Sequence, residues 1–222
     1  MTAPLSVLLK QSTSAAHEAA ESSPFMGDLL EGRLDAAAVA ALTAQLYTLY
    51  GAMESVAGTQ YGSDPLLAGF LDPALERTAA LEADMAFHYG SCWHDRLADG
   101  RIVTVPATTA YATLIREHHS AEFMLANHYV RLLGDLSGGQ IIHRLVQRHY
   151  GIPDDGLNFY LFPGIGKMKQ YKDGYRLRLD ALALDADRTG AVLAHAAHAF
   201  RLNGDIFGDL HSAVGARPQP AA

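Results

Sequence analysis

Apolar residues along the chain recur at intervals of three and four positions, and no stretch alternates between apolar and polar residues for long. Intervals of three and four place side chains on one face of an α-helix, whereas alternation is typical of a half-buried strand. One example is the segment 42–53, in which Leu46, Leu49 and Tyr50 share a broad apolar face. The pattern therefore predicts an all-α fold.

Capping residues and prolines set the expected helix boundaries. Ser and Asp accept hydrogen bonds from the first turn, Pro fits that turn, and Gly ends a helix. We expect residues 91–105 to form a loop. The expected helices cover 4–21, 24–32, a segment from Asp35, segments opened by Asp64-Pro65 and by Asp72-Pro73 up to Gly90, then 106–119, 120–151, 167–182 and 187–210.

Length and composition favour one packed domain. The chain has 222 residues, 49% of them hydrophobic and 18% charged, and it has no low-complexity linker. We therefore expect one domain over residues 1–212 and a flexible tail over 213–222. The net charge of −7 argues against a nucleic-acid partner, because phosphate binding needs a basic face.

The cellular compartment is suggested by the cysteine content and by the apolar runs. Cys92 is the single cysteine, so no internal disulfide can form and a reducing cytoplasm is suitable. The apolar run near the N-terminus is too short for a signal peptide, and we expect no segment of the length that spans a membrane. A cytoplasmic protein without a membrane anchor is expected.

Three glycines interrupt the longest helical pattern. Gly134, Gly138 and Gly139 should each cost about 1 kcal/mol relative to alanine inside a helix. Gly134 and Gly138 are four positions apart, so they bare one face of the backbone, which could then lie against a flat partner. The same glycines favour a kink. Close packing against another helix, or a simple break, is the alternative explanation.

Two further features carry candidate chemistry. His17 and Glu21 are four residues apart, a spacing at which a carboxylate can orient an imidazole for metal binding. Lys172 and Arg176 lie in a basic run and could hold two acidic groups from one side. Taken alone, the histidine could be an ordinary packed residue, and the basic run could be an ordinary solvated face.

Three segments together resemble the haem oxygenase family, especially its soluble bacterial members. They are AAHEAAESSPFMGDLLEGRL, HYVRLLGDLSGGQIIHRLVQRHYG and KQYKDGYRLRLDAL, and GDLSGGQ is the most specific part. The resemblance extends over about residues 5–210. It implies a single-domain helical enzyme that cleaves haem with O2 and external electrons to biliverdin, carbon monoxide and ferrous iron.

The resemblance also implies a haem b group, both substrate and cofactor, between the first helix and a glycine-kinked helix. His17 matches the ligand of the haem iron, and Glu21 matches the residue that holds the other ring nitrogen of that ligand. Gly134, Gly138 and Gly139 match the glycines whose backbone touches the opposite haem face. Their missing side chains leave space for O2 and direct it toward one edge of the ring.

On that side of the haem, Asp135 matches the aspartate that anchors an ordered water network for proton delivery. Tyr50, Arg131 and Asn203 match other members of the network. Contacts to the haem propionates are implied for Lys10, Tyr129, Lys172 and Arg176. Because they fix the rotation of the ring, attack at the α-meso carbon is expected. The apolar wall positions are Met26, Leu29, Phe159 and Phe200.

Some positions depart from the family pattern. Leu132 stands where many members have an aromatic residue, and Gly164 and Gly166 loosen the loop before the basic helix. An external electron donor, such as a ferredoxin or a flavoprotein reductase, is implied because the chain has neither a nucleotide-binding GxGxxG motif nor a cysteine set for an iron–sulfur cluster. Lys167 and Lys169 are the expected docking residues for an acidic donor.

Other functions were weighed against this one. A di-iron bundle needs paired Glu-x-x-His motifs, which the chain lacks. Cys92 as a thiolate ligand of haem has no matching pocket pattern. A fortuitous metal site could involve His118, His119, His195 and His198. The main alternative is a haem-binding or haem-delivery protein without turnover, from which Asp135 distinguishes an oxygenase because a carrier needs no proton network.

Overall fold

The computed structural model describes residues 3–215, and this part of the chain is helical without strands. This confirms the predicted all-α class. The α-helices are α1 (Leu5–Glu21), α2 (Pro24–Leu30), α3 (Ala36–Gln60), α4 (Thr78–Tyr89), α5 (Trp93–Ala98), α6 (Pro106–Glu117), α7 (Ala121–Tyr150), α8 (Met168–Asp180) and α9 (Ala186–Gly215). Short 3-10 helices are η1 (Pro73–Leu75), η2 (Asp154–Gly156), η3 (Asn158–Tyr160) and η4 (Pro163–Ile165).

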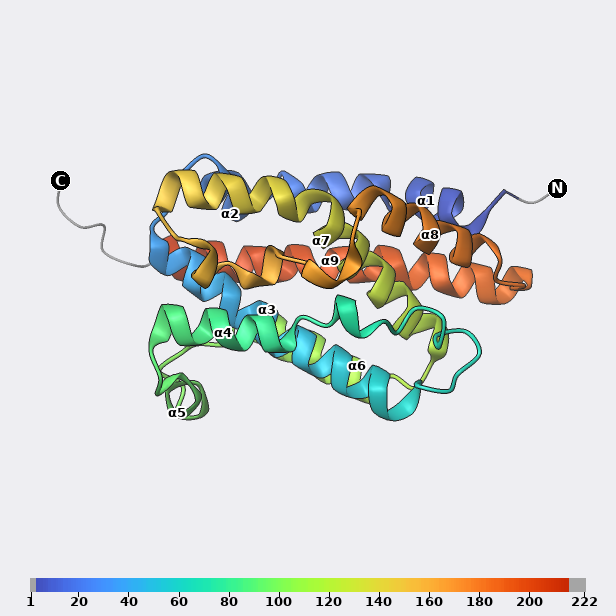
Figure 1. Ribbon diagram of the computed structural model, residues 1–222, viewed down its shortest axis with the longest axis horizontal. Helices are drawn as coiled ribbons and strands as arrows, with labels where there is room; N and C mark the ends of the chain where they lie inside the picture. The colour runs from blue at the N-terminus through green and yellow to red at the C-terminus, as the bar shows by residue number, and fades with distance from the viewer. Residues whose placement is uncertain (1–2, 216–222) are drawn as a thin grey trace.

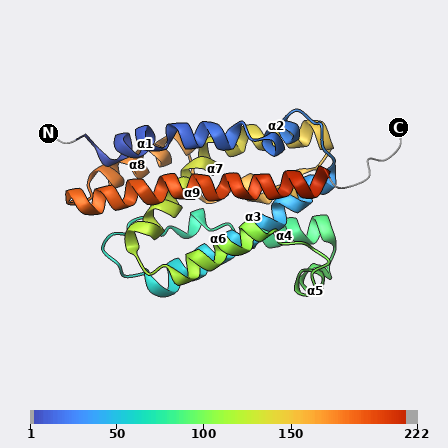
Figure 2. The same ribbon diagram turned by 180° about the vertical axis from the view of Figure 1, so that it is seen from behind.

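The helices form two layers (Figure 1). One layer contains α1, α2, α8 and α9, and α9 packs against both α1 and α7. The other contains α3, which packs against α4 and α6. Helix α7 joins the layers: it remains helical through its glycines, but its two halves run in different directions, as the reverse view also shows (Figures 1 and 2).

Several predicted boundaries are confirmed because the capping contacts form. The Asp35 carboxylate accepts a hydrogen bond from the Ala38 amide, which begins α3. The Ser120 hydroxyl accepts one from the Phe123 amide and begins α7. Gly151, with φ of 66°, ends α7 in the left-handed conformation that glycine adopts without strain.

Other expectations are wrong. Residues 91–105 contain the short helix α5, because Trp93 is buried and its ring packs edge-on against Tyr47 at 4.9 Å. Asp64-Pro65 opens turns instead of a helix, and Asp72-Pro73 opens only the short helix η1, after which the helical run is interrupted before α4 begins at Thr78. The last helix continues to Gly215, so residues 213–215 of the predicted tail are helical, and the rest of that tail lies outside the described residues.

Within residues 3–215, one helix is long and apolar enough to cross a membrane, contrary to the expectation from the sequence. Helix α3 has 25 residues and a mean hydropathy of 1.2 over its most apolar window, and 61% of that window is buried inside the protein. Its residues Leu49, Tyr50 and Met53 belong to the hydrophobic core. The core position of α3 accounts for its composition.

Gly32 provides a test of the packing between α2 and α7. It has φ of 75°, and a Cβ atom there would lie 2.6 Å from His149 Nδ1. Gly32→Ala should destabilise the fold by about 1–2 kcal/mol, since the conformation is strained for alanine and the imidazole must move. Gly208→Ala is the control: Gly208 lies within α9 with nothing within 4 Å, so alanine should be neutral or stabilising there. Urea unfolding compares the two, and an equal effect would contradict this account.

Candidate haem-binding site

A cavity of about 850 Å³ opens between α1 and α7, with α8 and α9 contributing to its wall. This volume is within the range of sites that bind cofactors and other small molecules. The lining residues are Ser6, Val7, Lys10, Gln11, Thr13, Ser14, His17, Tyr129, Val130, Leu133, Gly134, Ser137, Arg176 and Phe200. Six of the predicted site residues are therefore together: Lys10, His17, Tyr129, Gly134, Arg176 and Phe200.

The α7 side of the cavity presents bare backbone. Gly134 lines the cavity, and a Cβ atom there would meet nothing within 4 Å. Gly138 also faces open space, although it is not part of the lining. Gly139 differs, because a Cβ atom would lie 3.3 Å from Cδ1 of Tyr160. The three glycines thus have two roles: two leave space, and the third allows close packing in the core.

The α1 side presents one imidazole. The His17 side chain is 47% exposed, its Nε2 lies 3.5 Å from Oε1 of Glu21, and its ring packs edge-on against Phe200 at 5.3 Å. The spacing of the pair on α1 is as expected, but the distance is longer than a typical hydrogen bond. No group of three or more metal-binding side chains occurs within residues 3–215. A metal bound at His17 would therefore need ligands other than these side chains.

Positive charge gathers at the same cavity. Lys10 and Arg176 line it, and Lys172 Nζ lies 3.3 Å from the hydroxyl of the lining residue Ser137. Arg176 forms an ion pair with Asp173 at 3.1 Å on the same helix. In a protein with a net charge of −7, these cations favour an anionic group at this position.

A partly buried polar cluster lies next to the bare backbone. Asp135 follows Gly134 on α7, and its carboxylate accepts a hydrogen bond from the Tyr50 hydroxyl of α3. The Arg131 guanidinium lies over the rings of Tyr50, at 5.7 Å, and Tyr111, at 5.5 Å. Burial raises the pKa of Asp135 to about 6, against the opposing effects of the Tyr50 hydrogen bond and of the positive charge of Arg131 and Arg77. A carboxyl group with this pKa can exchange protons near neutrality.

The remaining predicted site residues lie outside the cavity lining. Met26, Leu29 and Phe159 are buried in the hydrophobic core and do not line the cavity. Asn203 is 9% exposed, and its Oδ1 atom has no hydrogen-bond partner among the described residues. A buried carbonyl oxygen of this kind is a suitable partner for a bound water.

Sequence reasoning missed several residues of the site. Gln11 and Ser14 line the cavity on α1, and the run of three-residue steps from Gln11 to Ser14 and from Ser14 to His17 was a signal that could have identified them. Arg77 and Asp84 are buried charged residues near the polar cluster. Nothing in the local sequence marks those two, because their partners are distant along the chain.

Comparison with known proteins decides the family. The family model described as heme oxygenase matches residues 3–209. The chain belongs to the haem oxygenase family. The protein is therefore an enzyme, and the resemblance inferred from the three sequence segments is confirmed.

Individual haem oxygenases are similar to this chain in both sequence and structure. The chain is 34% identical to heme oxygenase 1 of Gallus gallus over 96% of this chain and 72% of the relative, and 35% identical to heme oxygenase of Rhodella violacea over 94% and 87%. The crystal structure of a heme complex of heme oxygenase-1 from the cyanobacterium Synechocystis has a TM-score of 0.87, with 31% identity and 96% of each chain covered. The predicted single-domain fold is confirmed.

The raised pKa of Asp135 predicts a pH-dependent stability. The folded state binds this proton up to about pH 6, whereas the unfolded chain releases it near pH 4. The contribution of Asp135 to the free energy of unfolding therefore falls as pH rises between these values. Asp135→Asn should gain stability relative to the native chain as pH increases from 4 to 7, measured by urea unfolding at each pH.

The native chain must be compared with Asp135→Asn because His128 changes the free energy of unfolding with pH in the opposite direction. Burial lowers the pKa of His128 to about 3, so its contribution to stability rises over the same pH range. This contribution is common to both chains and cancels in their difference. A difference that is independent of pH would contradict the raised pKa of Asp135.

Proposed function

We propose that this haem oxygenase binds haem b in the cavity between α1 and α7, with His17 as the protein ligand of the iron. One observation carries the proposal: a single imidazole and the bare backbone at Gly134 line the same cavity from different helices. Glu21 Oε1 lies 3.5 Å from His17 Nε2, so a shorter contact with either ring nitrogen would let the carboxylate orient the imidazole while the other nitrogen faces the iron. The cations Lys10, Lys172 and Arg176, with Tyr129, would bind the propionates and fix the rotation of the ring.

Haem is itself the substrate, which O2 and electrons convert at the α-meso carbon to biliverdin, carbon monoxide and ferrous iron. The missing side chains at Gly134 and Gly138 would leave the space for O2. Asp135, oriented by Tyr50 and flanked by Arg131, would hold waters at the cavity and deliver protons through them. The free Oδ1 atom of Asn203 is a further position for a water in this network.

Electrons would come from a ferredoxin or a flavoprotein reductase, and the proposed location of the enzyme is the cytoplasm. Lys167 precedes α8 and Lys169 lies within it, on the helix that also carries Arg176, and both lysines are exposed. Lys169 is paired with Asp173 at 2.7 Å, which reduces the positive charge offered to an acidic donor. Such docking would be weak and sensitive to salt.

The alternative is a haem carrier on the same fold. The cavity and His17 would serve a carrier equally well, whereas the Asp135 cluster favours turnover. Incubation with haemin, a reductant and O2 separates the two functions: biliverdin and released carbon monoxide support the oxygenase, and stable bound haem after addition of electrons supports the carrier. The isomer of the product tests attack at the α-meso carbon.

His17→Ala tests the iron ligand. The variant should retain the cavity and bind haem more weakly, with a changed absorption spectrum that added imidazole restores, since only the metal ligand is removed. His211→Ala, on an exposed part of α9, is the control and should leave the spectrum as in the native chain. If the haem spectrum of His17→Ala is the same as that of the native chain, another residue binds the iron.

Asp135→Ala tests proton delivery. The variant should bind haem with an affinity close to that of the native chain, but form biliverdin roughly 100-fold more slowly, because proton transfer by a positioned side chain contributes about that much or more. Peroxidase-like oxidation of an added phenol should increase. Asp205→Ala, exposed on α9, is the control. An undiminished rate of biliverdin formation by Asp135→Ala would exclude this role.

A further inference from the structure

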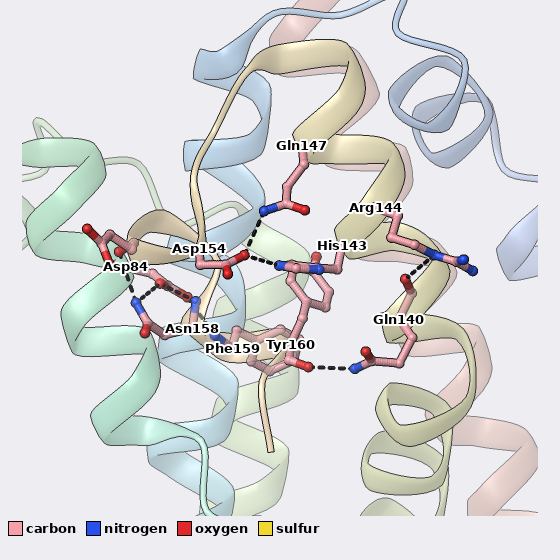
Figure 3. Close-up of polar contacts among 10 residues, drawn as sticks. Asp84, Gln140, His143, Arg144, Gln147, Asp154, Asn158, Phe159 and Tyr160 are labelled. Atoms are coloured by element: carbon pink, nitrogen blue, oxygen red, sulfur yellow. Dashed lines mark hydrogen bonds and ion pairs between the residues drawn. The ribbon is translucent and has the colours of Figure 1, made fainter. Parts of the chain in front are cut away.

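The loop that connects α7 to α8 is held by a buried carboxylate of α4 (Figure 3). Asp84 is 1% exposed, and its Oδ1 accepts hydrogen bonds from the backbone amide of Asn158 at 2.7 Å and from Asn158 Nδ2 at 2.9 Å. Its Oδ2 accepts one from the Phe159 amide at 2.8 Å. A buried carboxylate is costly unless such donors satisfy it, so the loop and α4 depend on one another.

Phe159 is also held through its carbonyl group. Arg77, which is 5% exposed, donates from Nη1 to the carbonyl oxygens of Phe159 at 3.4 Å and Leu161 at 2.6 Å. The amide of Phe159 is thus fixed by Asp84 and its carbonyl by Arg77. This leaves the Phe159 side chain little freedom, because both peptide groups that flank it are anchored.

The Phe159 ring connects the loop to the candidate site. It packs edge-on against the Tyr50 ring, with 5.2 Å between centroids and 74° between planes, and both rings are buried. Tyr50 in turn donates its hydroxyl hydrogen bond to Asp135. The next residue supports α7 as well: the Tyr160 carbonyl accepts a hydrogen bond from Gln140 Nε2 at 2.7 Å. A continuous series of contacts therefore runs from Asp84 to Asp135.

We propose that Asp84 is a positioning residue: by anchoring Phe159 it holds the Tyr50 ring in the orientation that directs its hydroxyl at Asp135. The inference rests on the proposed function of Asp135 in proton delivery. Without the anchor, the Phe159 ring can withdraw and the Tyr50 ring can tilt, so the hydrogen bond to the carboxylate weakens. Because that hydrogen bond stabilises the charged form, Asp135 then binds its proton more tightly.

Asp84→Asn tests the inference in the full chain without haem. In the variant, the asparagine NH2 group faces a backbone N–H that formerly donated a hydrogen bond to the carboxylate. Because two donors cannot pair, one anchor is lost with little change in shape. Titration of the 13C-labelled Asp135 carboxyl group by NMR, assigned with Asp135→Asn, should show about tenfold tighter proton binding. Tyr50→Phe removes the hydrogen bond entirely and so gives the largest rise in the proton affinity of Asp135 that its loss can cause. Asp135 titrating as in the native chain, or losing its proton more easily, would overturn the proposal.

Two further variants keep the test decisive. Glu82→Gln removes the same charge from an exposed position of α4 and should leave the Asp135 titration unchanged. Phe159→Leu retains the backbone donors of Asp84 but removes the aromatic edge, and should raise the proton affinity of Asp135 in the same way. The double variant Asp84→Asn/Phe159→Leu should show no further rise, because both act through one ring.

Each outcome bears on the proposal. If Asp84→Asn does not fold, an unchanged Asp135 titration in Phe159→Leu overturns the inference, and additive effects in a folded double variant also overturn it. A merely structural role for Asp84 would lower the free energy of unfolding without moving the titration of Asp135. The titration requires no haem, so a chain that binds haem without cleaving it would refute the proposed function and leave this result intact.

Discussion

The site depends on a helix that stays helical where it lacks side chains. Gly134 continues the backbone of α7 without filling the space toward α1, so His17 faces a cavity and not a packed interface. Each such glycine weakens a helix by about 1 kcal/mol, a cost that the packing of α7 against α9 and α3 must offset. If this stretch packed as an ordinary helical face, there would be no room for a flat ligand.

A step of one residue along α7 then separates two environments. Gly134 lines the cavity, whereas Asp135, about 100° further round the helix, joins the partly buried cluster with Tyr50 and Arg131. The cavity and the group that can exchange protons are therefore adjacent by helix geometry alone. The pKa of about 6 at Asp135 arises because burial outweighs the stabilising neighbours.

Most of the fold was predictable because its boundaries are local. The caps at Asp35 and Ser120 and the stop at Gly151 depend on contacts within a few residues, so the sequence contains all that is needed. The errors lie where packing decides. Helix α5 forms around the buried Trp93, whose partner Tyr47 is distant in sequence, and local patterns carry no signal of that contact.

The sequence by itself determined the residue types and spacings of the site: the pair His17 and Glu21, the glycines beside Asp135, and the basic run of α8. Only the tertiary structure decided that Gly139 serves core packing, that Met26 belongs to the core and not to the cavity lining, and that Asp84 and Arg77 hold the loop near Tyr50. The physical reason is separation along the chain. Asp84 and Phe159 are 75 residues apart, and such a contact exists only after helices from both layers have packed.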